Sequence, residues 1–427
     1  MGSFSSPLSG LTAAQDMLQT VSNNLANIDT NGFKDQTLTF SSVFSQSGAT
    51  NGSGDPMQTG AGVAVSSTVT DFTEGTINTT GTPSNMAISG TGFFVTQNPT
   101  GSQDYTRSGD FTTNNAGELT TPNGELLLGY PAANGIVNTS AALAPMQVSS
   151  VTSPAVASTT MSITANLDAT SSVGTMAASS LPVFDSLGTS HTLSVTYTMT
   201  AANTWSYAVT MPSIDLNGAS GSTTTVASGT LNFDSTGKLV STQATGAATT
   251  STPAAGIAVA IPPTGMTLAD GAGAMAVNWK LVNQSSTPTI TQTATASATS
   301  ATSTNGFAAG TLASYAVQPD GSIEGTFSSG ATFALGQVAV ASFANEQGLV
   351  CTGNNNYQPT AASGSAVVGL AGTGGRGKIV GGSVEGSNVD IAAEFAKLIV
   401  AQQAYSSNAK SITTFNQVSQ STLAMLQ

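Results

Sequence analysis

The sequence has 427 residues, a length that suggests about two to four domains. Charged residues make up only 7% of it and the formal net charge is −13, whereas a typical soluble domain is roughly 25% charged. An acidic chain with so few Lys and Arg side chains is poorly suited to neutralising phosphates, so we expect no nucleic-acid partner. No apolar run approaches the roughly 18 residues that a membrane-spanning helix needs, so we expect no membrane insertion.

Residues that carry chemistry are scarce. The start of the chain has neither a positively charged segment nor an apolar core, so we expect no cleavable secretory signal. Cys351 is the single cysteine and excludes an intrachain disulfide; we expect it to be a small buried apolar group. The single histidine, His191, has Asp185 nearby in sequence, but no second histidine or serine elbow accompanies it. The sequence therefore predicts a protein that is not an enzyme, with no cofactor, no catalytic residues and no metal ligands.

The first 30 residues have the pattern of a helix with a heptad seam. Its apolar positions recur at spacings of three and four residues, at Leu11, Ala14, Leu18, Val21, Leu25 and Ile28. Ser6 and Pro7 supply an N-cap and a first-turn proline, and Asn31-Gly32 supplies a stop signal. This spacing predicts an N-terminal helix with one apolar stripe.

The C-terminal segment repeats this pattern over a longer stretch. Its seam is formed by Ile391, Phe395, Leu398, Tyr405, Ile412, Leu423 and Leu426, with the polar residues Gln402 and Asn416 in two further positions. Ser387 and Asp390 resemble a capping box at its start. Each seam could be the ordinary core-facing stripe of a globular helix. We favour an assembly interface, because neither helix has a helical neighbour in its own half of the chain.

The interior has the pattern of β-structure. Short apolar runs and turn signals between Met86 and Tyr130 predict an antiparallel meander. A second β region spans about Met161 to Trp279, with an alternating strand at His191–Met199 and a strand pair formed by Trp205–Met211 and Thr230–Phe233. The Ser/Thr/Ala-rich stretch Ser285–Thr304 is typical of a linker or an irregular extended segment.

Several motifs resemble the flagellar axial proteins of the rod and hook. At the N-terminus these are Ser9-Gly10-Leu11, the asparagines Asn24 and Asn27, and Gly32-Phe33-Lys34; at the C-terminus they are Glu385 to Asp390, including Asn388. Ala87–Phe94 and Tyr105–Phe111 resemble the first β-domain of that family. The length, the run Val183–Gly188 with His191 after it, and Phe343–Leu349 resemble the hook members in particular.

The resemblance implies a fold that is mainly β with α-helical termini, in which the terminal helices form a coiled-coil core and two β-domains are nested in one another. The expected parts are a terminal coiled coil (1–30 and 385–427), a connector (31–70 and 371–384), an inner β-domain (71–146 and 305–370) and an outer β-domain (147–304). The complementary seams at the two ends support this out-and-back path independently.

The function that the resemblance implies is a hook subunit that self-assembles into a flexible hollow helical tube and couples motor torque to the filament. The expected partners are further copies of the chain, the rod protein, the hook cap, the hook–filament junction proteins and the flagellar export apparatus. The expected location is the hook, at the cell exterior.

Two alternatives remain open at this point. A secreted β-rich adhesin or carbohydrate-binding module would account for the Ser/Thr/Gly content, but not for paired terminal heptads. A distal rod protein of the same family would be shorter and would lack the outer domain.

Overall fold

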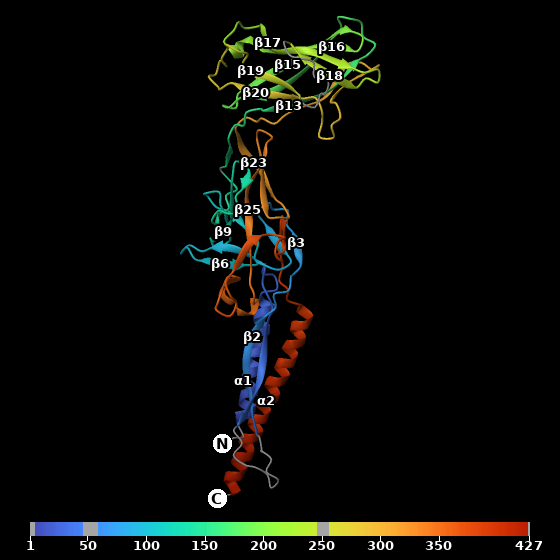
Figure 1. The fold of residues 1–427 in the computed structure, drawn as a ribbon. Helices are drawn as coiled ribbons and strands as arrows, with labels where there is room; N and C mark the ends of the chain where they lie inside the picture. Colours follow the sequence, from blue (N-terminus) through green and yellow to red (C-terminus); the bar gives the residue numbers. More distant parts are fainter. Residues whose placement is uncertain (1–4, 46–58, 150, 246–255, 426–427) are drawn as a thin grey trace. The chain divides into compact units, whose positions relative to one another are not determined.

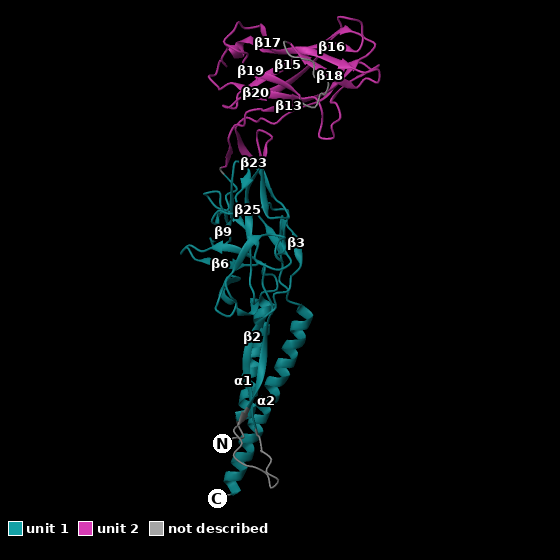
Figure 2. Cartoon of the chain, in the orientation of Figure 1, with its two compact units in different colours: residues 1–150, 314–325, 333–427 teal, residues 151–313, 326–332 magenta. Residues whose placement is uncertain are grey.

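The computed structural model describes residues 5–45, 59–149, 151–245 and 256–425. The chain divides into two compact units (Figure 2): residues 1–150, 314–325 and 333–427 form unit 1, and residues 151–313 and 326–332 form unit 2. Unit 2 is therefore inserted into unit 1, and the predicted fold class, mainly β with helical ends and nested β parts, is confirmed. The finer four-part division stays a prediction.

Two long helices lie at the ends of the chain and pack along each other within unit 1 (Figure 1). They are α1 (Ser5–Ala26) and α2 (Ile391–Met425). A β-hairpin formed by β1 (Gln36–Ser45) and β2 (Thr59–Thr70) packs on α1. The sequence analysis described this hairpin only as a connector, because its strands carry no regular apolar alternation.

Asparagine, aspartate and glycine set the ends of the helices. The chain leaves α1 through a turn that ends at Gly32, whose φ of 69° is in the region that glycine adopts without strain. The predicted cap of α2 was wrong by three residues: Asp390, not Ser387, is the N-cap. Its Oδ1 accepts hydrogen bonds from the backbone N–H groups of Ala392 (2.8 Å) and Ala393 (3.2 Å).

The middle strands of the central sheet of unit 1 are largely buried on both faces. Its neighbouring strands follow the order β25-β9-β5-β6-β27-β26. Successive residues of one strand enter different cores: Phe93 packs with Val95 and Tyr357 on one side, and Phe94 packs with other side chains on the opposite side. This explains why these strands have continuous apolar runs instead of alternation. The bounds are β5 (Phe93–Gln97), β6 (Gln103–Thr106), β9 (Leu126–Ala133), β25 (Thr332–Ser342), β26 (Val350–Gly353) and β27 (Asn356–Gln358).

The predicted meander was wrong in its strand order. β5 and β6 form an antiparallel hairpin, but β9 returns to pair with β5, and β5 also pairs with β25 from the far end of the chain. Two more pairs join distant segments, β3 (Ile77–Thr79) with β30 (Ser383–Glu385) and β4 (Met86–Ser89) with β29 (Lys378–Gly381). The smaller elements are β7 (Thr112–Thr113), β8 (Leu119–Thr120), β10 (Ile136–Val137), β11 (Ala144–Pro145), β28 (Val367–Leu370) and η3 (Glu346–Gly348). Unit 1 is thus built from both halves of the chain.

Unit 2 contains two five-stranded sheets that share one core. One sheet has the order β14-β15-β16-β17-β18, and the other has β19-β20-β13-β21, with β22 also paired to β13. Side chains of both sheets belong to one buried cluster, in which the Tyr207 ring meets the Trp279 ring edge to face at 5.5 Å. The bounds are β13 (Thr160–Asp168), β14 (Met176–Phe184), β15 (Ser190–Ala201), β16 (Thr204–Pro212), β17 (Thr223–Phe233), β18 (Leu239–Ala244), β19 (Ile257–Ile261), β20 (Met275–Lys280), β21 (Ile290–Thr293) and β22 (Ala298–Thr304).

Two predictions for this region have opposite outcomes. The alternating strand at His191–Met199 and the strand pair of Trp205–Met211 with Thr230–Phe233 are confirmed by β15, β16 and β17. The prediction that Ser285–Thr304 is a linker or an irregular extended segment was wrong for most of its length, because β21 and β22 both pair with β13. Ladder hydrogen bonds need only backbone groups, so a strand of exposed Ser, Thr and Ala carries no apolar pattern. Unit 2 also contains β12 (Thr152–Ser153) and η1 (Ser213–Leu216), and the two units divide within β23 (Gly310–Val317) and β24 (Ser322–Phe327).

Candidate assembly site at the chain ends

The contact between α1 and α2 uses small and polar side chains. Ala14, Val21 and Asn24 are the buried residues of α1, and Glu394 and Ala401 are those of α2. The helices also approach closely at Gly10, where a Cβ atom would lie 2.8 Å from Nδ2 of Asn408. Glu394, Ala401 and Asn408 follow one another at seven-residue intervals, the repeat of a coiled-coil seam.

The residues of the predicted N-terminal seam face the inside of unit 1. Ala14 and Val21 are buried, and Leu11, Leu18, Leu25 and Ile28 are half-buried. Ile28 lies in the turn that follows α1. The structure therefore places the whole N-terminal stripe against other parts of unit 1.

Much of the predicted C-terminal seam remains exposed. Leu398 and Ile412 are half-buried, but Ile391, Phe395, Tyr405 and Leu423 are exposed, and Leu426 lies outside the described residues. Ile399 and Val400, which the sequence analysis did not select, are 58% and 60% exposed. The face of α2 that meets α1 is therefore more polar than the predicted seam, and apolar side chains of α2 are left uncovered within the chain.

Seven side chains form a polar network where the two chain ends meet, and we call it the terminal network: Asn24, Lys34, Asp35, Arg107, Glu385, Asn388 and Glu394. Asn24 is fully buried at one end of it. Its Nδ2 donates to Glu394 Oε2 (3.1 Å), to Gln36 O (2.8 Å) and to Asp35 Oδ1, and its Oδ1 accepts from the backbone N–H of Gln36 (3.1 Å). One amide thus joins α1, β1 and α2, which explains why asparagine stands there.

Asn388 joins the same segments immediately before α2. Its Oδ1 accepts from the backbone N–H of Asp35 (2.8 Å), and its Nδ2 donates to the carbonyl oxygens of Asp71 (2.9 Å) and Thr73 (3.2 Å). With Asp390 as the N-cap, this sets where α2 begins and which residues of the N-terminal half it faces.

Glu385 is the centre of a buried ion network. Its Oε1 lies 2.6 Å from Lys34 Nζ and its Oε2 lies 3.2 Å from Arg107 Nη1; the side chains of Lys34, Arg107 and Glu385 are 0%, 2% and 0% exposed. Oε1 also accepts from the backbone N–H of Gly75 (2.9 Å). Both cations also donate to carbonyl oxygens, Lys34 to Thr73 (2.6 Å) and Arg107 to Gly90 (2.7 Å), whereas Arg107 Nε has no hydrogen-bond partner among the described residues. Buried charges are tolerated when they are paired in this way.

Burial changes the acid–base properties of the network. It lowers the pKa of the Lys34 ammonium below the usual 10.5, although Glu385 opposes that shift. Burial also raises the pKa of the Asp35 carboxyl above 3.8; the Lys397 ammonium acts to lower it, while the Glu394 carboxylate adds to the rise. For Lys397, burial acts to lower the pKa, but the hydrogen bond with Glu394 and the charge of Asp35 outweigh it and the pKa is raised.

Two motif residues near α1 require close packing. Gly32 combines its positive φ with a Cβ position only 2.5 Å from the Ser108 backbone nitrogen, and its own N–H donates to Glu385 O (2.8 Å). Phe33 is buried. In Asn27, Nδ2 donates to Asn23 O (2.8 Å) and Oδ1 accepts from Thr30 Oγ1 (3.2 Å). All six predicted motif residues (Asn24, Asn27, Gly32, Phe33, Asn388 and Asp390) thus lie in the region where the chain ends meet or in the turn after α1.

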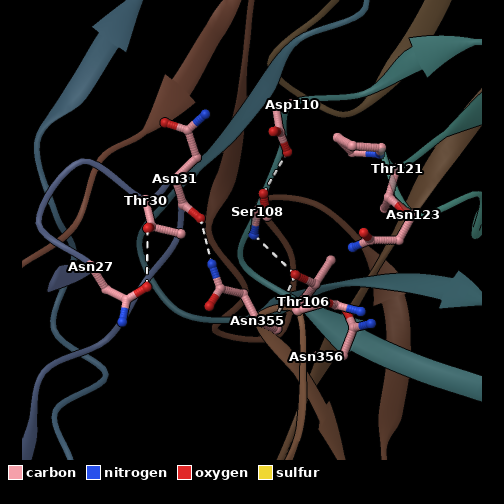
Figure 3. A pocket seen from close by; sticks show the side chains of 12 residues that line it. Asn27, Thr30, Asn31, Thr106, Ser108, Asp110, Thr121, Asn123, Asn355 and Asn356 are labelled. Carbon is pink, nitrogen blue, oxygen red and sulfur yellow. Dashed lines mark hydrogen bonds between the residues drawn. The ribbon is translucent and has the colours of Figure 1, made fainter. Parts of the chain in front are cut away.

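A polar pocket of about 390 Å³ lies beside that turn (Figure 3). Asn27, Thr30 and Asn31 line one side of it, and the rest is lined by Thr106, Ser108, Asp110 and residues 121–123 and 354–356. Asn355 Nδ2 donates to Asn31 O (2.8 Å), and Thr106 Oγ1 donates to Asn355 O (2.9 Å). Its lining consists mainly of Asn, Thr and Ser side chains, which donate and accept hydrogen bonds.

Two further expectations concern the single cysteine and a membrane-spanning helix. Cys351 is exposed, so the prediction that it is buried was wrong; it lies in β26, whose burial pattern is exposed throughout. Neither helix of the described chain combines the length and apolarity that crossing a bilayer requires.

Comparisons with known proteins agree along the chain. Residues 7–34 match the family model "Flagella basal body rod protein", 87–168 match "Flagellar hook protein FlgE/F/G D1 domain", 151–307 match "Flagellar basal body protein FlaE D2 domain", and 380–425 match "Flagellar basal body rod FlgEFG protein C-terminal". The first and last of these matches contain five of the seven residues of the terminal network.

Relatives cover almost the whole chain. The flagellar hook protein FlgE of Salmonella typhimurium is 34% identical over 430 residues, which is 97% of this chain and 98% of the relative. FlgE of Escherichia coli K12 is 33% identical over 437 residues, again 97% and 98%. The crystal structure of Helicobacter pylori FlgE2 is similar over 71% of this chain and 98% of that one, with 15% identity and a TM-score of 0.49. From the two near-full-length relatives it follows that this chain belongs to the flagellar hook protein (FlgE) family.

Proposed function

We propose that this chain is a structural subunit of the flagellar hook that self-assembles into a flexible hollow helical tube and couples motor torque to the filament. The observation that carries this proposal is the set of apolar side chains that α2 leaves uncovered, among them Ile391, Phe395, Ile399 and Val400. Together with the membership of the hook family, these side chains support an assembly contact formed by the terminal helices of neighbouring copies.

Burial of apolar surface is the driving force for this contact. Each methylene that leaves water contributes about 0.8 kcal/mol, so several such side chains on one helix give a strong contact. A helical tube requires heterologous contacts that do not close into a ring. The exposed face of α2 and the hairpin β1–β2 on α1 are different surfaces of one chain, as a heterologous contact needs.

Bending of the tube needs weaker contacts elsewhere. Unit 2 contains only two cationic side chains, Lys238 and Lys280. A surface of hydroxyls and small side chains offers few charge pairs that would favour one fixed register. We propose that the contacts between copies through unit 2 slide as the tube bends, while the contacts between the terminal helices stay unchanged.

The finer assignments are part of the same proposal. The partners would be further copies of the chain, the rod, the hook cap, the hook–filament junction proteins and the export apparatus, and the location would be the hook outside the cell. The chain would have no enzymatic activity. The four-part division into a terminal coiled coil, a connector and two β-domains would describe how it is used in the tube.

The comparisons favour this function over the two alternatives. We would not expect a β-rich adhesin to be similar to hook proteins over its whole length. We would not expect a distal rod protein to have a sequence match over unit 2.

The test introduces a charge into the exposed face of α2. Ile399→Glu leaves the fold of the chain unchanged because Ile399 is exposed, but it places a carboxylate in the proposed contact. We expect the variant to have a circular dichroism spectrum like that of the parent chain. We also expect that it forms no tubes that sediment or that can be seen in electron micrographs. The control is Ile136→Glu, which changes an exposed isoleucine outside the helices. If Ile399→Glu polymerises like the parent chain, the assembly contact does not use this face of α2.

A further inference from the structure

Four side chains from separate segments of unit 2 converge on one another: Asp185, His191, Asp215 and Asp270, here called the His191 cluster. Asp185 follows β14, His191 lies in β15, Asp215 lies in η1, and Asp270 lies in the loop between β19 and β20. The distance from His191 Nε2 is 3.2 Å to Asp185 Oδ2 and 3.7 Å to Asp270 Oδ2, and His191 Nδ1 lies 3.1 Å from Asp215 Oδ2. The His191 side chain is only 4% exposed and that of Asp185 is 0% exposed.

Backbone hydrogen bonds orient two of the carboxylates toward the ring. Asp185 Oδ1 accepts from the N–H groups of Leu187 (2.8 Å) and Thr189 (2.9 Å), which directs Oδ2 at His191. One oxygen of Asp270 is held in the same way by the N–H of Ala272 (3.0 Å). Two loops therefore direct one carboxylate oxygen each toward the same ring nitrogen.

The charges in the cluster do not balance. Three carboxyl groups face one imidazole ring, whereas a simple ion pair needs one. Lys238 and Lys280 are the two Lys or Arg residues of unit 2, and neither forms an ion pair with the cluster in the part of the chain that the structure describes. Neighbouring carboxylates need either a shared proton or a cation between them.

The donor atoms have the types and spacing of a metal site. One atom each from Asp185, His191 and Asp270 lies within 4.8 Å of the other two. Zinc binds His nitrogen and Asp oxygen at about 2.0–2.2 Å in a tetrahedron, which sets neighbouring ligands about 3.4 Å apart. The distances of 3.2 and 3.7 Å from Nε2 bracket that value.

Asp215 supplies a second, independent feature of such a site. A histidine that binds a metal through one nitrogen almost always donates its other ring N–H to a carboxylate or a carbonyl, which fixes the tautomer. Asp215 Oδ2 stands at Nδ1, so the lone pair of Nε2 would face Asp185 and Asp270. The Asp270 side chain is 23% exposed, which gives an ion a path from solvent and leaves a position for water.

We propose that Asp185, His191 and Asp270 bind one divalent transition-metal ion of the Zn²⁺ type, with Asp215 as a positioning residue on His191. The ion would hold the loop before β20 to the start of β15 and would stabilise unit 2. Sequence spacing does not predict such a site, because its first and last ligands lie 85 positions apart with no recurring spacing. The site is a property of the single chain and does not depend on the proposed assembly.

The experiment uses the full chain after dialysis against a chelator, with Zn²⁺ as the probe. Isothermal titration should give one site per chain. Thermal unfolding followed by tryptophan fluorescence should shift upward with Zn²⁺, because both tryptophans, Trp205 and Trp279, are buried in the core of unit 2. Co²⁺ at the same site should show the visible absorption of a tetrahedral complex.

Three variants make the outcome decisive. Asp270→Asn removes a partly exposed ligand and should abolish the site, whereas Asp234→Asn, an aspartate in another turn of unit 2, should bind like the parent chain. Asp215→Asn keeps the ligands and should weaken binding about 10- to 100-fold. The proposal is overturned if the parent chain binds no Zn²⁺, which would leave His191 held by its carboxylates alone, or if Asp270→Asn binds as tightly as the parent chain.

Discussion

Replacing Glu385 with Gln is the most direct test of the terminal network. The change keeps the size of the side chain and removes one negative charge from a site that is 0% exposed. Lys34 and Arg107 then remain buried with no anion in contact, because Glu385 is the acidic partner of both.

The expected loss of stability is large. Removing one partner of a buried ion pair costs about 3–5 kcal/mol, because the remaining charge stays uncompensated. For a unit of this size, 1 kcal/mol corresponds to about 2–4 °C in Tm, so the loss amounts to about 6–20 °C. A second change, Lys34→Met in the same chain, should recover part of the loss because it removes one of the two unpaired cations.

The two units can be followed separately in this assay. Both long helices lie in unit 1, so circular dichroism at 222 nm reports mainly on unit 1, whereas both tryptophans lie in unit 2. We expect Glu385→Gln to lower the helical transition and leave the tryptophan transition in place. The control is Glu346→Gln, also in unit 1, where the described residues contain no ion partner for Glu346. A loss below about 1 kcal/mol, the range of exposed ion pairs, would show that the network is solvated and that our account of it is wrong.

Three further changes test other features of unit 1. Gly109→Ala places a Cβ atom 1.5 Å from Met86 O, so β4 must shift. We expect the free energy of unfolding, measured with urea, to fall by about 1–3 kcal/mol. Gly60→Ala is the control and should cause no loss, because a Cβ atom there meets open space. Asp390→Ala removes the N-cap of α2 and should lower the free energy of unfolding by about 0.5–2 kcal/mol. Asp390→Asn keeps a capping oxygen and should retain most of that stability. Equal stability of the Ala and Asn variants would refute the role of the cap. Because burial raises the pKa of Asp35 above 3.8, its ionised form destabilises the native state, and this penalty is relieved as the pH falls through the folded pKa toward 3.8. The free energy of unfolding of the parent chain, measured with urea, should therefore rise relative to that of Asp35→Asn as the pH is lowered through that range. If this difference falls instead, the raised pKa of Asp35 is contradicted.

Sequence reasoning recovered the features that depend on local periodicity. The heptad spacing of Leu11 to Ile28 predicted α1, and the alternation from His191 to Met199 predicted β15, because both patterns arise from one element packing on one surface. The hairpin β1–β2 and strand β22 were missed, because their largely exposed side chains leave no such pattern.

The contacts between the two chain ends were predicted only in part for a related reason, and the role of the seams in assembly stays a prediction. Apolar spacing selected Phe395 and Tyr405 on α2, whereas the face that meets α1 is built on Glu394, Ala401 and Asn408. The motif asparagines were identified by resemblance, but their hydrogen bonds were not, because the partners of Asn24 and Asn388 lie up to 370 residues away in the chain. Contacts at that separation are set by the three-dimensional path and not by local spacing.

The salt bridge between Lys34 and Glu385 spans 351 positions of the chain. During synthesis from the N-terminus, Lys34 is therefore made long before Glu385. The ion pair can form only after all the residues between them have been made. Unit 1 can be completed only when residues 385–427 are present, and a chain truncated before Glu385 would retain the two-sheet sandwich of unit 2 while α1 lost its contact with α2. The C-terminal segment therefore decides when the fold of unit 1 is complete.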